Sequence, residues 1–218
     1  MTVRFVGRGM VTDAQECCED GREDLTLYGF GGLGEVSYDK ELKGESDYFE
    51  RVARLSKQTK GVVVCGCVTD TRGIKRKSAL LAEDGRLCGV SDMTHSLDGA
   101  VSPGAGLREY DTKIGKIGVA VAEDILFPEV VSALVSCGSD FIVCPYGTVT
   151  DTRTQVLLRA YAYLYGTPIL LCGIGYCILV ESDGTVGLAT PQSPVVFTLK
   201  NRKRYHLVSI RCKGGVQT

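Results

Sequence analysis

The sequence has no tryptophan, only two histidines and almost no net charge: 25 lysines and arginines stand against 26 aspartates and glutamates. A protein that binds nucleic acid through its phosphates normally has a basic surplus, so no nucleic-acid partner is expected. The apolar runs are far shorter than the about 20 residues that cross a bilayer, so no membrane association is expected either. The first residues lack the apolar segment of a secretory signal, which predicts a cytoplasmic protein.

Metal-binding patterns are also absent, although ten cysteines are present. Cys17 and Cys18 are adjacent and a single residue separates Cys65 from Cys67, whereas zinc sites use C-x-x-C or cysteine–histidine pairs. Other cysteines lie within Val/Ile/Leu runs, where a thiol behaves as a small buried hydrophobe. Disulfide scaffolds are short and rich in loops, which this chain is not. We therefore expect no disulfide framework, no metal and no cofactor.

The pattern of apolar residues predicts an α/β protein with two buried layers of strands, formed as a single domain over residues 1–218. Continuous apolar runs indicate strands that are buried on both faces. Apolar residues at three- and four-residue steps indicate helices, and Asp-Gly pairs between apolar runs indicate hairpins. The predicted strands are 62–68, 117–122, 141–144 and 169–172; the predicted helices are 47–57, 128–136 and 155–165; the predicted hairpin turns are 83–85 and 182–184.

One segment resembles a known family closely. Residues 116–129 read Lys-Ile-Gly-Val-Ala-Val-Ala-Glu-Asp-Ile-Leu-Phe-Pro-Glu and resemble the nucleophile elbow of the nitrilase, or carbon–nitrogen hydrolase, superfamily. The stretch 84–95, the pair Pro103-Gly104 and the stretch 138–145 also resemble that family's pattern, and the resemblance is strongest over 48–199. It implies a four-layer αββα sandwich. It also implies hydrolysis of nitriles or amides by a Glu–Lys–Cys triad.

The residues at the three triad positions do not suit this chemistry. Aligned without gaps, the resemblance places Ala122 at the cysteine, Met93 at the lysine and Phe30 at the glutamate. The reaction needs a thiolate nucleophile, a carboxylate that takes its proton and an ammonium that stabilises the developing charge. A methyl group, a thioether and a phenyl ring supply none of these. The sequence therefore predicts a non-catalytic homologue that acts by binding a small molecule or as a subunit partner.

A second hypothesis is that the protein is an enzyme, an amidase- or nitrilase-type hydrolase that uses a displaced cysteine. Cys144 ends the strand after the elbow, and Glu123 or Glu35 is the candidate base. Substrate-binding candidates are Glu123, Asp124, Cys144 and Tyr146. In the structural alternative Cys144 is a packed strand residue, Asp124 caps the helix near 127–129, His95 bonds the backbone and the basic run 75–77 is solvated.

The resemblance also implies an assembly. Members of this family pair through the helix after the elbow and a later helix, which correspond here to 128–136 and 155–165. The later helix is expected to present Tyr161 and Tyr165 on one face and Tyr163 on another. A tyrosine suits an interface because its ring buries apolar area while its hydroxyl keeps a polar contact. A homodimer through these helices is therefore predicted.

Overall fold

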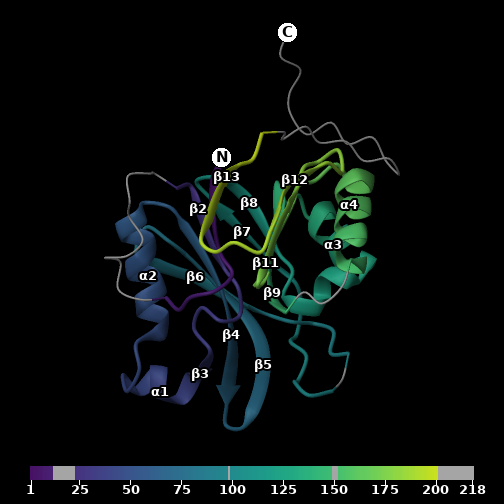
Figure 1. Cartoon of the computed structure of the whole chain (residues 1–218). Coiled ribbons are helices and arrows are strands. Elements are labelled where there is room, and N and C mark those ends of the chain that lie inside the picture. Colours follow the sequence, from purple (N-terminus) through teal and green to yellow (C-terminus); the bar gives the residue numbers. More distant parts are fainter. Residues whose placement is uncertain (12–22, 98, 149–151, 201–218) are drawn as a thin grey trace.

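The computed structural model describes residues 1–11, 23–97, 99–148 and 152–200, and in them two β-sheets lie face to face between two layers of helices (Figure 1). The seven-stranded sheet has the order β13-β1-β2-β4-β5-β6, and β3 pairs with β4 beside this path. Its strands are β1 (Thr2–Val6), β2 (Leu25–Tyr28), β3 (Glu35–Ser37), β4 (Val62–Thr71), β5 (Ile74–Glu83), β6 (Arg86–Asp92) and β13 (Val195–Thr198).

The six-stranded sheet has the order β12-β11-β10-β9-β8-β7. Parallel pairing of β8 with β9 and of β9 with β10 forms its centre, and antiparallel pairs form its two edges. Its strands are β7 (Arg108–Thr112), β8 (Gly115–Val119), β9 (Phe141–Thr148), β10 (Ile169–Ile174), β11 (Tyr176–Val180) and β12 (Val186–Thr190).

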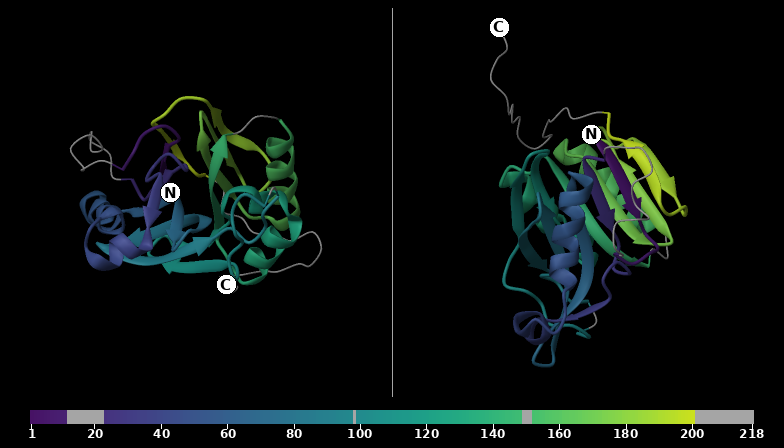
Figure 2. Two further views of the ribbon diagram at one scale, coloured as in Figure 1. Left: turned by 90° about the horizontal axis from the view of Figure 1, so that it is seen from below. Right: turned by 90° about the vertical axis from the view of Figure 1, so that its left-hand side faces the viewer.

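The helices cover the two outer faces of this sandwich. The short α1 (Tyr38–Lys43) and the longer α2 (Tyr48–Thr59) lie against the seven-stranded sheet. The 3-10 helix η2 (Ala122–Leu126), α3 (Pro128–Ser136) and α4 (Arg153–Tyr165) lie against the six-stranded sheet. The left view of Figure 2 shows the blue helices α1 and α2 on one side of the sheets and the green helices α3 and α4 on the other. The predicted αββα arrangement is confirmed.

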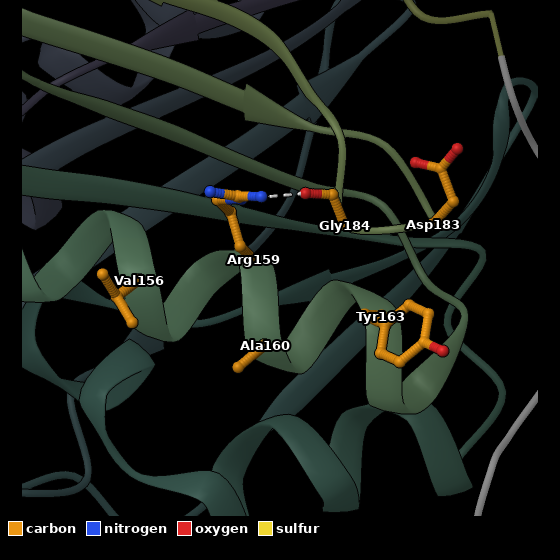
Figure 3. Close-up of a pocket in the computed structure, with 6 residues that line it drawn as sticks. All are labelled: Val156, Arg159, Ala160, Tyr163, Asp183 and Gly184. Atoms are coloured by element: carbon orange, nitrogen blue, oxygen red, sulfur yellow. Dashed lines mark hydrogen bonds between the residues drawn. The ribbon is translucent and has the colours of Figure 1, made fainter.

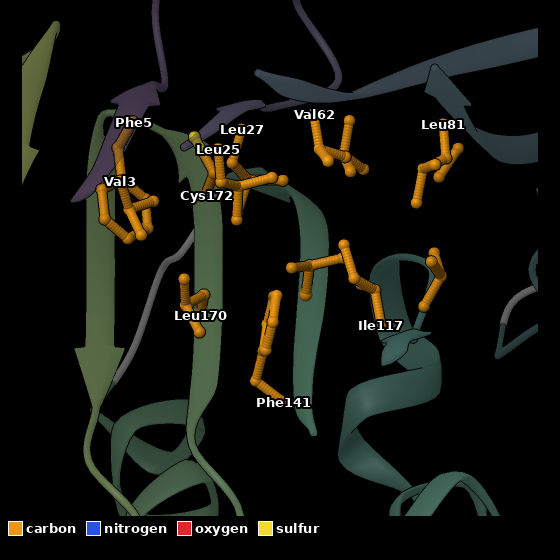
Figure 4. Packing of buried hydrophobic residues seen from close by; sticks show 14 of the residues in the cluster. Val3, Phe5, Leu25, Leu27, Val62, Leu81, Ile117, Phe141, Leu170 and Cys172 are labelled. Atoms are coloured by element: carbon orange, nitrogen blue, oxygen red, sulfur yellow. The ribbon is translucent and has the colours of Figure 1, made fainter. Parts of the chain in front are cut away.

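The core has three apolar layers that follow from this stacking. The middle layer lies between the sheets, where residues such as Phe5, Leu27 and Leu81 face Ile117 and Phe141 (Figure 4). A second layer packs under α3 and α4, and a third packs under α2. A strand with helix on one face and sheet on the other is apolar on both faces, which explains the continuous apolar runs in the sequence.

The predicted elements are found with small changes at their ends. The strand predicted at 117–122 ends at Val119, because the chain turns there into η2. The helices predicted at 47–57 and 155–165 are observed as Tyr48–Thr59 and Arg153–Tyr165. Both predicted hairpins form, as β5–β6 and as β11–β12. In the described parts of the chain, no helix has the length and apolar character of a membrane-spanning segment.

Candidate functional site

The turn after β8 has a strained residue at its tip. Ala122 adopts a φ of 51°, in the left-handed region that favours glycine. That conformation costs an L-residue roughly 1–2 kcal/mol, and strained residues of this kind cluster at functional sites. The turn is fixed on both sides, because the amide of Ala120 donates to Val143 and that of Asp124 donates to Val121. The backbone thus makes a sharp, strained strand-to-helix turn, and the residue at its tip carries only a methyl group.

The three positions that the sequence analysis assigned to the triad lie in or against the middle layer of the core. Ala122 and Met93 are each 1% exposed and belong to the same apolar cluster between the sheets. Phe30 is partly buried and packs against that cluster, and its amide donates to the carbonyl of Tyr146. The side chains at these positions therefore form packed apolar core. That they correspond to the family's triad stays a prediction.

A cation lies beside the elbow, but it comes from another sheet. The Nζ atom of Lys77 on β5 lies 2.7 and 2.8 Å from the two carboxylate oxygens of Glu123. Both side chains are less than one-third exposed, and the amide of Met93 donates to the carbonyl of Lys77. The basic run 75–77 was predicted to be solvated: Lys75 is 47% exposed and pairs with Glu35 at the surface at 2.8 Å, whereas Lys77 is partly buried and pairs with Glu123. These pairs connect residues more than 35 positions apart, so no local sequence signal indicates them.

Asp124 organises the loop that follows Met93. Its carboxylate is fully buried and accepts four hydrogen bonds, from the amide and hydroxyl of Thr94 and from the amide and Nδ1 of His95, all at 2.8–3.0 Å. The His95 ring stacks on Phe127 with centroids 4.2 Å apart. Two expectations are corrected here. Asp124 does not cap α3 with its side chain, because its carboxylate is taken up by Thr94 and His95. The His95 ring bonds this carboxylate and not the backbone.

Cys144 touches the backbone of Ala122, but its side chain lies in a different apolar layer from the side chains at the predicted triad positions. It belongs to the apolar layer under α3 and α4, together with Tyr146, whereas Met93 and Ala122 face the layer between the sheets. Its thiol is fully buried and donates to the Ala122 carbonyl at 3.5 Å. Burial raises the pKa of Cys144 well above its ordinary range, and the charges of Asp124 and Glu123 raise it further. A thiol in this state stays protonated at neutral pH, and only the thiolate is nucleophilic.

The two bases suggested for Cys144 are engaged elsewhere. Glu123 accepts both hydrogen bonds from Lys77, and Glu35 is half-exposed on β3 and pairs with Lys75. The four substrate-binding candidates also divide between environments: Asp124 and Cys144 are fully buried, Tyr146 is 8% exposed and Glu123 is paired. The structure therefore does not gather Glu123, Asp124, Cys144 and Tyr146 around an open cleft.

A pocket lies beside His95, and the sequence analysis did not predict it. A pocket of about 290 Å³ is formed where the loop after Met93 meets the start of α3. His95 and Glu129 give it polar groups, and the Nε2 atom of His95 lies 4.0 Å from the carboxylate of Glu129. The lining residues are Thr94, His95, Gly104, Ala105, Gly106, Leu107, Glu129 and Val130. Within the described residues, no group of three or more His, Cys, Asp or Glu side chains is arranged to hold a metal ion.

Comparison with known proteins decides the family. The model of the carbon–nitrogen hydrolase family matches residues 25–193, which is most of the chain. The chain belongs to the carbon–nitrogen hydrolase family. The predicted resemblance to the nitrilase superfamily is thereby confirmed.

Two curated relatives match this carbon–nitrogen hydrolase in part. A deaminated glutathione amidase from Homo sapiens is 30% identical over 156 residues, which are 63% of this chain and 46% of the relative. The Bos taurus protein of the same name is 34% identical over 107 residues, or 42% of this chain and 33% of the relative. The aligned segments thus span less than half the length of either relative.

Solved structures of the superfamily share the fold. Nit3 of Saccharomyces cerevisiae, described as a member of branch 10 of the nitrilase superfamily, has a TM-score of 0.73 at 19% identity and covers 90% of this chain and 88% of its own. An amidase mutant from Nesterenkonia sp. AN1 in complex with butyramide has a TM-score of 0.72 at 15% identity, covering 90% and 88%. At these identities the likeness shows the fold alone.

Proposed function

We propose that this carbon–nitrogen hydrolase homologue is non-catalytic and acts by binding a small molecule or as a subunit partner. The observation that carries the proposal is the packing at the elbow: the side chains of Ala122 and Met93 are 1% exposed in an apolar cluster. Hydrolysis of an amide or nitrile requires a nucleophile and a charge stabiliser that meet the substrate. A methyl group and a thioether in a closed core provide neither.

The ion pair of Lys77 with Glu123 supports the same proposal. An ammonium beside an elbow could stabilise a developing negative charge, but this one is bound to both oxygens of a carboxylate at 2.7 and 2.8 Å. A paired ammonium has its charge already neutralised, and releasing it would leave a partly buried carboxylate unpaired. The small-molecule function is supported instead by the pocket beside His95, which offers a histidine and a carboxylate at its surface.

We expect the purified full chain to hydrolyse neither simple amides and nitriles nor deaminated glutathione above the buffer background. Butyramide and deaminated glutathione belong in the panel because the similar proteins include an amidase in complex with butyramide and a deaminated glutathione amidase. We also expect a substrate-like electrophile to leave Cys144 unlabelled in the native protein, because its thiol is buried and protonated.

The matched control for this experiment is Cys144→Ser, which should leave every rate at background. Unfolded protein provides the reference for complete labelling. Saturable turnover that is lost in Cys144→Ser, with selective labelling of Cys144 in the native chain, would establish the displaced-cysteine hydrolase and overturn the non-catalytic proposal. Turnover that survives Cys144→Ser would overturn both.

The partner function rests on the surface of α4. Val156 is 63% exposed, Tyr163 49% and Leu164 39%, so apolar groups reach the surface on this helix. A pocket of about 340 Å³ lies between α4 and the β11–β12 turn, where Arg159 donates to the carbonyl of Gly184 at 3.1 Å (Figure 3). Tyr161 was expected on a face of the helix that is presented to a partner, and this is wrong: it is 6% exposed and its hydroxyl donates to the carbonyl of Leu126.

We propose that a second copy of the chain packs on α3 and α4 and covers this surface to form a homodimer. Light scattering at micromolar concentration should then give twice the single-chain mass of 23.4 kDa. The double variant Val156→Asp/Leu164→Asp should return the mass to that of one chain, because charge at a buried apolar contact is costly. The control Leu42→Asp, at an 84% exposed position on α1, should leave the dimer intact. A monomeric parent protein would contradict the proposal.

A further inference from the structure

Two cysteines face each other at the end of the β10–β11 hairpin. Cys172 and Cys177 are directly opposite in the antiparallel pairing, and their sulfur atoms lie 3.8 Å apart. Opposed residues in such a pair have Cα atoms about 4.5 or 5.5 Å apart, and both separations fall within the range that disulfides span. Only a local rearrangement of the side chains is therefore needed to bring the sulfurs to the bond length of about 2.05 Å.

The surroundings of the pair distinguish its two sulfurs. The two thiols hydrogen-bond each other, with either one able to donate, and the backbone amides of Gly7 and Gly173 act as further donors to the Cys177 sulfur. These donors lower the pKa of Cys177, against the effect of burial. Burial raises the pKa of Cys172, and its hydrogen bond to Cys177 raises it further. The lowered pKa makes Cys177 the more readily ionised thiol of the pair, and Cys172 is its immediate neighbour.

The backbone of Gly7 approaches the Cys172–Cys177 pair closely. A Cβ atom on Gly7 would lie 2.4 Å from the carbonyl oxygen of Gly173 and 3.2 Å from the Cys177 sulfur. The glycine therefore lets the segment after β1 approach the hairpin end and direct its amide at the sulfur. Figure 4 shows Cys172 on its strand of the six-stranded sheet, next to Leu25 and Leu27 of the opposite sheet. The pair is therefore enclosed between the sheets and receives donors from two chain segments.

The other buried cysteines differ from this pair. Burial raises the pKa values of Cys65 and Cys144 well above the ordinary range, and the charged groups near Cys144 raise its pKa further. Burial and the nearby Asp92 carboxylate raise that of Cys67. Reactive cysteines have donors or positive charge that favour the thiolate, which these three do not show.

We propose that Cys172 and Cys177 are a modification site: a dithiol that a hydroperoxide oxidises to a cross-strand disulfide. The Cys177 thiolate attacks one oxygen of the hydroperoxide, the O–O bond breaks, and Cys177 becomes a sulfenic acid while the other oxygen leaves as hydroxide or alkoxide and takes up a proton. The Cys172 sulfur then attacks the sulfenic sulfur. The S–S bond forms, the S–O bond breaks and water leaves with the Cys172 proton, so that two thiols are oxidised and one peroxide is reduced.

The test uses the full chain with Cys17, Cys18, Cys88, Cys137 and Cys212 replaced by serine, so that five buried cysteines remain. Native protein is treated with hydrogen peroxide, then denatured and alkylated, and its mass is measured by mass spectrometry. We expect a loss of about 2 Da and three alkylated cysteines, with all five alkylated after dithiothreitol treatment. Cleavage by chymotrypsin after Tyr176, which separates the two cysteines, should give two peptides joined by a reducible bond.

Two variants control the assignment. Cys172→Ser should abolish the loss of about 2 Da and leave Cys177 as a sulfenic acid that a 1,3-dione traps. Cys65→Ser should form the disulfide as the parent does, because Cys65 is not part of the hydrogen-bonded pair. Far-UV circular dichroism checks that each variant is folded. All five cysteines remaining alkylatable in folded, peroxide-treated protein, or a disulfide between any other two, would overturn the proposal.

Discussion

Replacing Asp124 with alanine should lower the free energy of unfolding by about 3–5 kcal/mol, the range found when one partner of a buried charged network is removed. The carboxylate is fully buried and accepts hydrogen bonds from two atoms of Thr94 and two of His95. Alanine would leave the amides of Thr94 and His95 without an acceptor, whereas the Thr94 hydroxyl and the His95 Nδ1 atom, 2.9 Å apart, can still bond to each other. Each unsatisfied buried group costs about 1–3 kcal/mol unless water reaches it. The measurement is urea unfolding followed by circular dichroism.

Two further variants separate this effect from a general loss of charge. Asp124→Asn keeps one acceptor oxygen but brings an NH₂ group towards the same donors, so we expect an intermediate loss of stability. Asp111→Ala removes an 86% exposed carboxylate on β7 and should change the unfolding free energy by less than about 0.5 kcal/mol. If Asp124→Ala changed the unfolding free energy as little as Asp111→Ala, the hydrogen bonds of Asp124 would not stabilise the loop after Met93.

Replacing Leu81 with alanine should cost about 2–5 kcal/mol of unfolding free energy, as large-to-small changes in closed cores do. Leu81 on β5 is 0% exposed and packs in the layer between the two sheets (Figure 4). The change removes buried apolar surface and leaves a cavity that two β-sheets close poorly, because their backbones are fixed by hydrogen bonds to neighbouring strands.

The matched control is the same substitution at the surface. Leu42 on α1 is 84% exposed, so Leu42→Ala should shift the unfolding free energy by no more than about 0.5 kcal/mol. Both variants are compared with the parent by urea denaturation at one temperature. Equal midpoint shifts for Leu81→Ala and Leu42→Ala would contradict the position of Leu81 in the inter-sheet core.

The layered fold and most of its elements could be predicted from the sequence, because their signals are local. A strand with sheet on one face and helix on the other needs apolar residues at every position, and the run 62–68 shows this directly. The hairpins follow from Asp84-Gly85 and Asp183-Gly184, since φ is positive at Asp84 and at both glycines, which turn residues of this kind tolerate. The segment 116–129 also indicated the family, which the match over residues 25–193 now shows.

The contacts at the candidate site were decided by the tertiary structure. Lys77 reaches Glu123 from the opposite sheet, 46 residues away, and Asp124 meets Thr94 and His95 across 29 or 30 residues. A single sequence indicates which residues are polar, but not which partners two packed sheets bring within 3 Å. The sequence by itself determined that positions 122 and 93 carry a methyl group and a thioether. Only the packing of the two sheets closed these positions as apolar core, because side chains far apart in the chain fill the same space.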